Sequence, residues 1–123
     1  MRVKADNVDA LFERSALALF DHLVGLDTIE AKSTRKLEVS ASAIDELMVS
    51  WLGELVYLFD SEGWLFNDFQ LQLNNNTIVA TGSGEHFDSE KHEIQYYIKA
   101  VTYHMLTVKK ENARWSATVI FDI

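Results

Sequence analysis

The chain has 123 residues, of which 48% are hydrophobic and 24% charged, so it is long enough for one domain and too short for two of ordinary size. Its lack of cysteine excludes disulfides, thiolate metal sites and cysteine nucleophiles. A formal net charge of −8 disfavours direct nucleic-acid binding, which normally needs a surplus of Lys and Arg, and suits a basic protein partner or a cation.

No segment of the sequence indicates export or membrane insertion. The first residues, MRVKADN, carry charge where a signal peptide needs an apolar core, and no apolar run approaches membrane-spanning length. Proline, repeats and low-complexity linkers are absent. We therefore expect a single domain over residues 1–123, located in the cytoplasm and without membrane contact.

The N-terminal part predicts a short strand, a helix and a second strand. Residues 2–5, RVKA, are typical of a strand. Asp6 or Asn7 is expected to cap a helix, because a short polar side chain can accept hydrogen bonds from the amides of the first turn. An apolar stripe at steps of three and four carries this helix to Gly25. A weakly alternating strand is expected at 35–41.

The most regular periodic segment of the sequence predicts a second helix. A capping box at 42–45 begins it, and Gly63 ends it. The segment is apolar nearly all round, so we expect it to pack against more than one neighbour.

Beyond Gly63 the apolar period changes to two, which predicts strands. Residues 64–73 and 77–85 are expected to form a hairpin, with a bend or bulge marked by Gly82 and Gly84. A polar loop at 85–92, a strand at 92–106, a turn at 109–112 and a last strand complete the chain. The predicted fold is α+β, a single-layer mixed β-sheet with two packed helices in the order β-α-β-α-β-β-β-β.

Lys99 is the unexpected residue of the segment HEIQYYIKAVTYHML (92–106). In a strand it lies on the face opposite Ile94 and Ile98. Either its side chain reaches water from a mostly covered face, or it is held for a negative partner. His104, on the Ile98 face, indicates a half-buried histidine rather than a catalytic base.

The last two residues bring two carboxylates together, the side chain of Asp122 and the main-chain terminus of Ile123. Such a pair can hold a hard cation such as Ca²⁺ or Mg²⁺, or can be a solvated chain end. Pairing of the last two strands about a turn at 109–112 places Lys99 near residues 121–123. Lys99 then either neighbours these oxygens or is an ordinary surface lysine.

The polar loop contains His86 and His92 on either side of Asp88 and Glu90. Their spacing matches no recognised metal motif, which favours a solvated loop. The sequence contains no Gly-rich phosphate loop and no nucleophile elbow.

Four blocks of the sequence resemble the archease family in their order, their spacing and the identity of their residues. They are SWLGELVYLFDSEG (50–63), GEHFDSEKHE (84–93), IKAVTYHML (98–106) and VIFDI (119–123). The segment LFERSALALFD (11–21) is similar to the family's first helix. The resemblance therefore covers nearly the whole chain.

This resemblance implies a small protein that activates an RNA ligase in tRNA splicing and RNA repair. Archeases promote the guanylylation of the ligase's active-site histidine by GTP and allow repeated turnover, without being ligases themselves. The resemblance implies no catalytic residue. It implies roles in activation for Lys99 and Asp122, and a divalent cation, Ca²⁺ or Mg²⁺, held by Asp122 and Ile123.

The sequence departs from the family pattern at its start. The family's cation site also uses an aspartate of an N-terminal HTAD-like strand, and Met1 stands where that strand is already half over. Asp6 and Asp9 belong to the first helix and do not replace it. We therefore expect weaker cation binding or none, and an unpaired sheet edge that favours self-association. A start codon placed too late and a true short form both explain the departure.

Two other functions remain open from the residues alone. One is a metal-dependent hydrolase or nucleotide-processing enzyme that uses Asp122, the Ile123 carboxylate and Lys99. The other is a small oligomeric binding or chaperone-like module.

Overall fold

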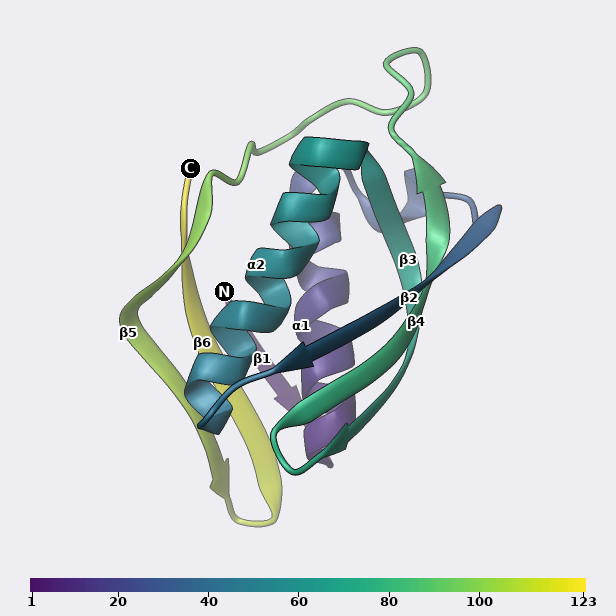
Figure 1. Cartoon of the computed structure of the whole chain (residues 1–123). Coiled ribbons are helices and arrows are strands. Elements are labelled where there is room, and N and C mark those ends of the chain that lie inside the picture. The colour runs from purple at the N-terminus through teal and green to yellow at the C-terminus, as the bar shows by residue number, and fades with distance from the viewer.

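The computed structural model describes residues 1–123 and contains two α-helices and six β-strands (Figure 1). In chain order the elements are β1 (Arg2–Ala5), α1 (Val8–Leu23), the short 3₁₀ helix η1 (Leu26–Thr28), β2 (Ser33–Ser40), α2 (Ile44–Glu62), β3 (Trp64–Asn74), β4 (Thr77–His86), β5 (Ala100–Glu111) and β6 (Arg114–Asp122). The α+β class and the predicted element order are confirmed. Neither α-helix has the combination of length and hydropathy needed to span a membrane.

The strands form two separate sheets, with the orders β1-β6-β5 and β2-β4-β3, and every pairing is antiparallel. Both helices contact strands of both sheets and lie between them (Figure 1). The prediction of one mixed sheet is therefore wrong. Because α2 is apolar nearly all round, its burial requires a sheet on each side. The β3-β4 hairpin pairs with β2 to form one sheet, and the β5-β6 hairpin pairs with β1 to form the other.

The ends of the helices follow from local chemistry. The side chain of Asn7 accepts a hydrogen bond from the Ala10 amide at 2.8 Å, so Asn7 is the N-cap of α1. The predicted capping box of α2 does not form, since Ser42 donates to the Glu46 carboxylate at 3.1 Å instead. Gly63 ends α2 in the left-handed conformation, with φ of 75°.

The two helices are joined through Trp51 of α2. Its side chain is completely buried, and its indole N–H donates to the main-chain carbonyl of Phe12 in α1 at 3.0 Å. The Trp51 ring also meets Phe69 of β3 edge to face, with 5.4 Å between ring centroids. The core therefore connects both helices to the β2-β4-β3 sheet.

A β-bulge interrupts the β3-β4 ladder between Phe66 and Asp68, opposite Gly84. A Cβ atom added at Gly84 would overlap the main-chain carbonyl of Leu65. The bend or bulge predicted from the glycine pair is therefore present, and its extra residue lies in the partner strand β3.

The segment preceding β5 differs from its prediction. The strand expected at 92–106 begins only at Ala100, which pairs with Asp122 near the end of β6. Residues 92–99 have no strand beside them, so their high β-propensity is not realised. Residues 87–99 instead form a loop that carries the chain from one sheet to the other across the end of the helices (Figure 1).

Candidate functional site

The structure brings together Lys99, Asp122 and Ile123, which we call the tail corner. The main-chain N–H of Lys99 donates to the carbonyl of Asp122 at 2.7 Å, and the next residue, Ala100, pairs with Asp122 in the β5-β6 ladder. Lys99 thus shares one end of the β1-β6-β5 sheet with the last two residues, although it is distant from them in the sequence.

The charged groups of the tail corner are free to interact with a partner. Lys99 and Asp122 are exposed, and Ile123 is 65% exposed. No ion pair within 4.0 Å joins the Lys99 ammonium to the Asp122 side chain or to the terminal carboxylate. The amine and the carboxylates are therefore exposed and make no ion pair in this structure.

The tail corner does not by itself form a complete site for a divalent cation. No group of three or more His, Cys, Asp or Glu side chains is arranged to hold a metal ion anywhere in the chain. Asp6 lies at the other end of β6, where its carboxylate pairs with the Arg114 guanidinium at 3.3 Å. Arg114 and Asp122 are eight residues apart on this strand, so Asp6 is about 26 Å from Asp122. Asp122 and the Ile123 terminus provide oxygen ligands that suit Ca²⁺ or Mg²⁺, but no third carboxylate joins them.

An apolar hollow of about 330 Å³ adjoins the tail corner. Its wall includes the ring of His22, which meets the rings of Tyr96 and Phe121 edge to face at 6.3 and 6.4 Å. The lining residues are Met1, His22, Tyr96, Ile98, Ile120, Phe121 and Ile123. An exposed charged corner beside an apolar hollow is a combination typical of protein interfaces.

The loop at 87–99, which leads to Lys99, is fixed at several points. The N–H of Gln95 donates to the Leu23 carbonyl at the end of α1, at 2.8 Å. The Tyr97 hydroxyl donates to Asp60 of α2 at 2.9 Å, and this hydrogen bond raises the pKa of the tyrosine. These contacts hold the main chain that precedes Lys99.

A charged cluster fixes the start of the same loop; we call Glu30, Lys32, Glu85, Lys91 and His92 the Glu85 cluster. The Glu85 carboxylate is only 5% exposed, and it accepts from the Glu30 N–H at 2.7 Å. Lys91 approaches it to 2.8 Å and Lys32 to 3.5 Å. Burial opposes ionisation of Glu85, but the hydrogen bonds from Lys91, Glu30 and His92 outweigh burial and lower its pKa to about 2.

Hydrogen bonding defines the tautomer of His92, whose side chain is buried. Its Nδ1 accepts from the Asp88 N–H at 3.0 Å, so Nδ1 carries no proton. Nε2 then bears the proton and donates to Glu85 at 3.1 Å. The imidazole is neutral and completely engaged, which leaves it no role as a catalytic base.

Sequence reasoning missed the Glu85 cluster. The expectation of a solvated loop is wrong for Glu85 and His92, both of which are buried. The one signal in the sequence was the neighbouring Gly84, where the main chain of β3 comes too close for a side chain; Glu85 is the next to last residue of β4. His104 is also corrected, because it is exposed in the irregular part of β5, where the ladder to β6 shifts between Thr102 and Thr107.

Comparisons with known proteins agree on one family. Residues 1–123 match the Archease protein family. The chain is 34% identical to the protein archease of Pyrococcus abyssi and 38% identical to that of Pyrococcus furiosus, in each case over all of this chain and 90% of the relative.

Solved structures also share this fold. The solution structure of protein 1598 of Methanobacterium thermoautotrophicum has a TM-score of 0.86 and 28% identity, covering 99% of this chain and 89% of that one. The crystal structure of a Thermotoga maritima archease, described as a possible chaperone, has a TM-score of 0.73, covers 100% of this chain and 88% of that one, and shares the fold at 18% identity.

Proposed function

The chain belongs to the archease family, and from this we propose that it is a protein activator of an RNA ligase in tRNA splicing and RNA repair. In this function the ligase performs the chemistry, and the chain promotes guanylylation of the ligase by GTP so that each ligase molecule turns over repeatedly. The chain contributes a contact surface and no catalytic residue of its own.

The exposed, unpaired charges of the tail corner are the observation that carries the proposal. Lys99 and Asp122 fall in two of the sequence blocks that resemble the family, and the structure brings these blocks together through one main-chain hydrogen bond. An ammonium and two carboxylates held at a fixed corner can bind groups of opposite charge on another enzyme. The net charge of −8 also suits a basic partner.

The apolar hollow beside the tail corner suits the same use. Its exposed lining includes Tyr96, at 56%, and Ile123, at 65%. An apolar or aromatic side chain of the ligase inserted there would lose contact with water, and such anchors supply much of the affinity of protein interfaces. We propose that the hollow gives affinity and that the charged corner gives orientation.

The proposed contact between the ligase and the tail corner does not require a cation. The family resemblance implies one, and Asp122 with the Ile123 terminus would hold it if the ligase or another group supplied further oxygen ligands. When bound there, it would add positive charge to the contact surface.

The test measures turnovers per ligase molecule with the cognate ligase, GTP and RNA ends bearing a 2′,3′-cyclic phosphate and a 5′-hydroxyl. We expect the chain to raise turnovers above those of the ligase alone. Lys99→Ala and Asp122→Asn should each lower this stimulation by roughly 10-fold or more, as expected for loss of one charged hydrogen bond. Lys36→Ala, an exposed lysine of β2 on the other sheet, is the matched control and should leave it unchanged.

Two results would contradict the proposal. One is the absence of any stimulation by the unaltered chain, and the other is equal stimulation by the Lys99→Ala, Asp122→Asn and Lys36→Ala variants. GTP hydrolysis by the chain without ligase would instead support the nucleotide-processing alternative. Suppression of ligase aggregation, independent of GTP, would support a chaperone-like module, in line with the Thermotoga archease being a possible chaperone.

A further inference from the structure

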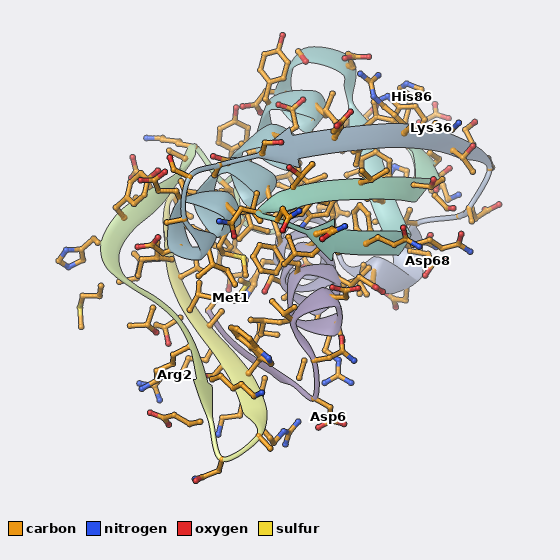
Figure 2. All side chains as sticks on the ribbon, turned by 60° about the horizontal axis from the view of Figure 1, so that its bottom comes forward. Met1, Arg2, Asp6, Lys36, Asp68 and His86 are labelled. Carbon is orange, nitrogen blue, oxygen red and sulfur yellow. The ribbon has the colours of Figure 1, made fainter.

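The outer face of the β1-β6-β5 sheet, away from the helices, collects basic and hydroxyl side chains. The strand register forms two rows across the three strands: Arg2, Thr118 and Thr107 in one, and Lys4, Ser116 and Lys109 in the next. The buried neighbours Ala5, Ala117 and Val119 alternate with these residues and point inward. Figure 2 shows Arg2 on this sheet, on the opposite side of the molecule from Lys36.

This face is concave and its charge is opposite to that of the whole chain. Residues of both rows line a hollow of about 360 Å³, in which three cations meet the single carboxylate of Glu111. Lys109 pairs with Glu111 at 2.9 Å, whereas Arg2 and Lys4 make no side-chain ion pair. The chain as a whole has a net charge of −8. A locally positive hollow on such a protein indicates a negatively charged ligand.

We propose that this basic face, defined as Arg2, Lys4, Lys109, Thr107, Ser116 and Thr118, binds the phosphate backbone of single-stranded RNA. The inference goes beyond the proposed function, because the face is separate from the tail corner and binding there requires no ligase. It also reverses the expectation, drawn from net charge alone, that the chain does not contact nucleic acid. A net charge averages over the surface and does not describe one sheet face.

The spacing of the cations suits several phosphates of one strand. Arg2 and Lys4 are two residues apart on β1, about 7 Å, and Lys109 lies two strands away from Lys4, about 10 Å. Each cation can therefore neutralise a different phosphate. The hydroxyl of Ser116 lies between Lys4 and Lys109, and that of Thr118 lies between Arg2 and Thr107. Both hydroxyls can donate to phosphate oxygens and exchange hydrogen bonds with the ribose 2′-hydroxyl. This row of hydroxyls favours RNA over an acidic protein segment as the ligand.

Fluorescence anisotropy with a labelled 20-nucleotide single-stranded RNA of mixed sequence tests the proposal, using the full chain and a salt titration. Counterion release predicts that log K falls with log salt with a slope of roughly −2 for three phosphate contacts on a single strand. By the same relation, the Arg2→Ala/Lys4→Ala double variant should lower affinity roughly 25-fold at about 0.1 M salt and reduce the slope by about 1.4.

Control variants separate the loss of these cations from misfolding and from a general loss of charge. Lys36→Ala removes one exposed lysine from the opposite sheet and should change affinity less than twofold. Arg2→Lys/Lys4→Arg keeps both charges and should bind RNA nearly as well as the unaltered chain. Thermal unfolding of each variant checks that the fold is kept.

The proposal fails if the unaltered chain does not bind the RNA at low salt, or if the Arg2→Ala/Lys4→Ala variant binds it as well as the Lys36→Ala variant does. A further arm of the test uses poly-glutamate as a competitor. If poly-glutamate occupies this face and the RNA does not, the ligand is an acidic protein segment and the RNA proposal is wrong.

Discussion

Replacing Glu85 by Gln removes the buried charge of the Glu85 cluster while keeping the shape of the side chain. The carboxylate is 5% exposed and is held by Lys91 at 2.8 Å and by the Glu30 N–H at 2.7 Å. Its pKa falls from 4.5 to about 2 on folding. At about 1.4 kcal/mol per pKa unit, this difference corresponds to about 3 kcal/mol of folding free energy near neutral pH.

The sign of the pH dependence follows from the lowered pKa of the folded state. Stabilisation by Glu85 is complete above its unfolded pKa of 4.5 and is lost as the pH falls through the folded pKa of about 2. We therefore expect the difference in unfolding free energy between the unaltered chain and Glu85→Gln to be about 3 kcal/mol at pH 7 and about 1 kcal/mol at pH 3.

Urea unfolding followed by tryptophan fluorescence measures this difference, since Trp51 and Trp64 are buried in the folded chain. Glu90→Gln is the matched control, because Glu90 lies in the loop at 87–99 that contacts Glu85, is exposed and makes no ion pair. The reasoning is refuted if Glu85→Gln destabilises the chain no more than Glu90→Gln does at pH 7. It is equally refuted if the difference between the unaltered chain and Glu85→Gln is the same at pH 3 as at pH 7.

Two further substitutions test the local structure by the same unfolding measurement. Gly84→Ala should lower the free energy of unfolding by at least about 3 kcal/mol, because the added methyl group overlaps the Leu65 carbonyl at the β-bulge. Gly53→Ala in α2 should instead raise it by up to about 1 kcal/mol, because nothing lies within 4 Å of the added atom. Equal effects of the two substitutions would contradict the bulge geometry. Asn7→Ala removes the side-chain acceptor for the Ala10 N–H and should cost about 1 kcal/mol, whereas an unchanged stability would mean that this cap contributes nothing.

The sequence by itself determined the helices, the order of the strands and the family. These features are local, since a stripe at helical spacing or a change of period at Gly63 depends only on neighbouring residues. The cap at Asn7 and the left-handed end at Gly63 are likewise properties of a few adjacent residues. The four blocks that resemble the archease family could also be recognised without any knowledge of their positions in space.

The tertiary structure alone decided which strands share a sheet and which residues are covered. The segment before Ala100 has the composition of a strand but no strand beside it, because β6 pairs no further than Asp122 opposite Ala100. Glu85 looks like a solvated acid in the sequence and is buried in the structure. Its carboxylate is contacted by Lys91 and His92 of the loop at 87–99 and by the segment that precedes β2, through Glu30 and Lys32. Pairing and burial depend on partners that are distant in the chain, so local periodicity does not encode them.

The basic face is likewise decided by the tertiary structure and not by the sequence alone. Lys109 lies more than 100 residues after Arg2 and Lys4 in the sequence, and composition reports only the sum of their charges. Antiparallel pairing of β1 and β5 with β6 sets their side chains on one face. The local sign of the charge is therefore a property of the strand register, which the tertiary structure supplies.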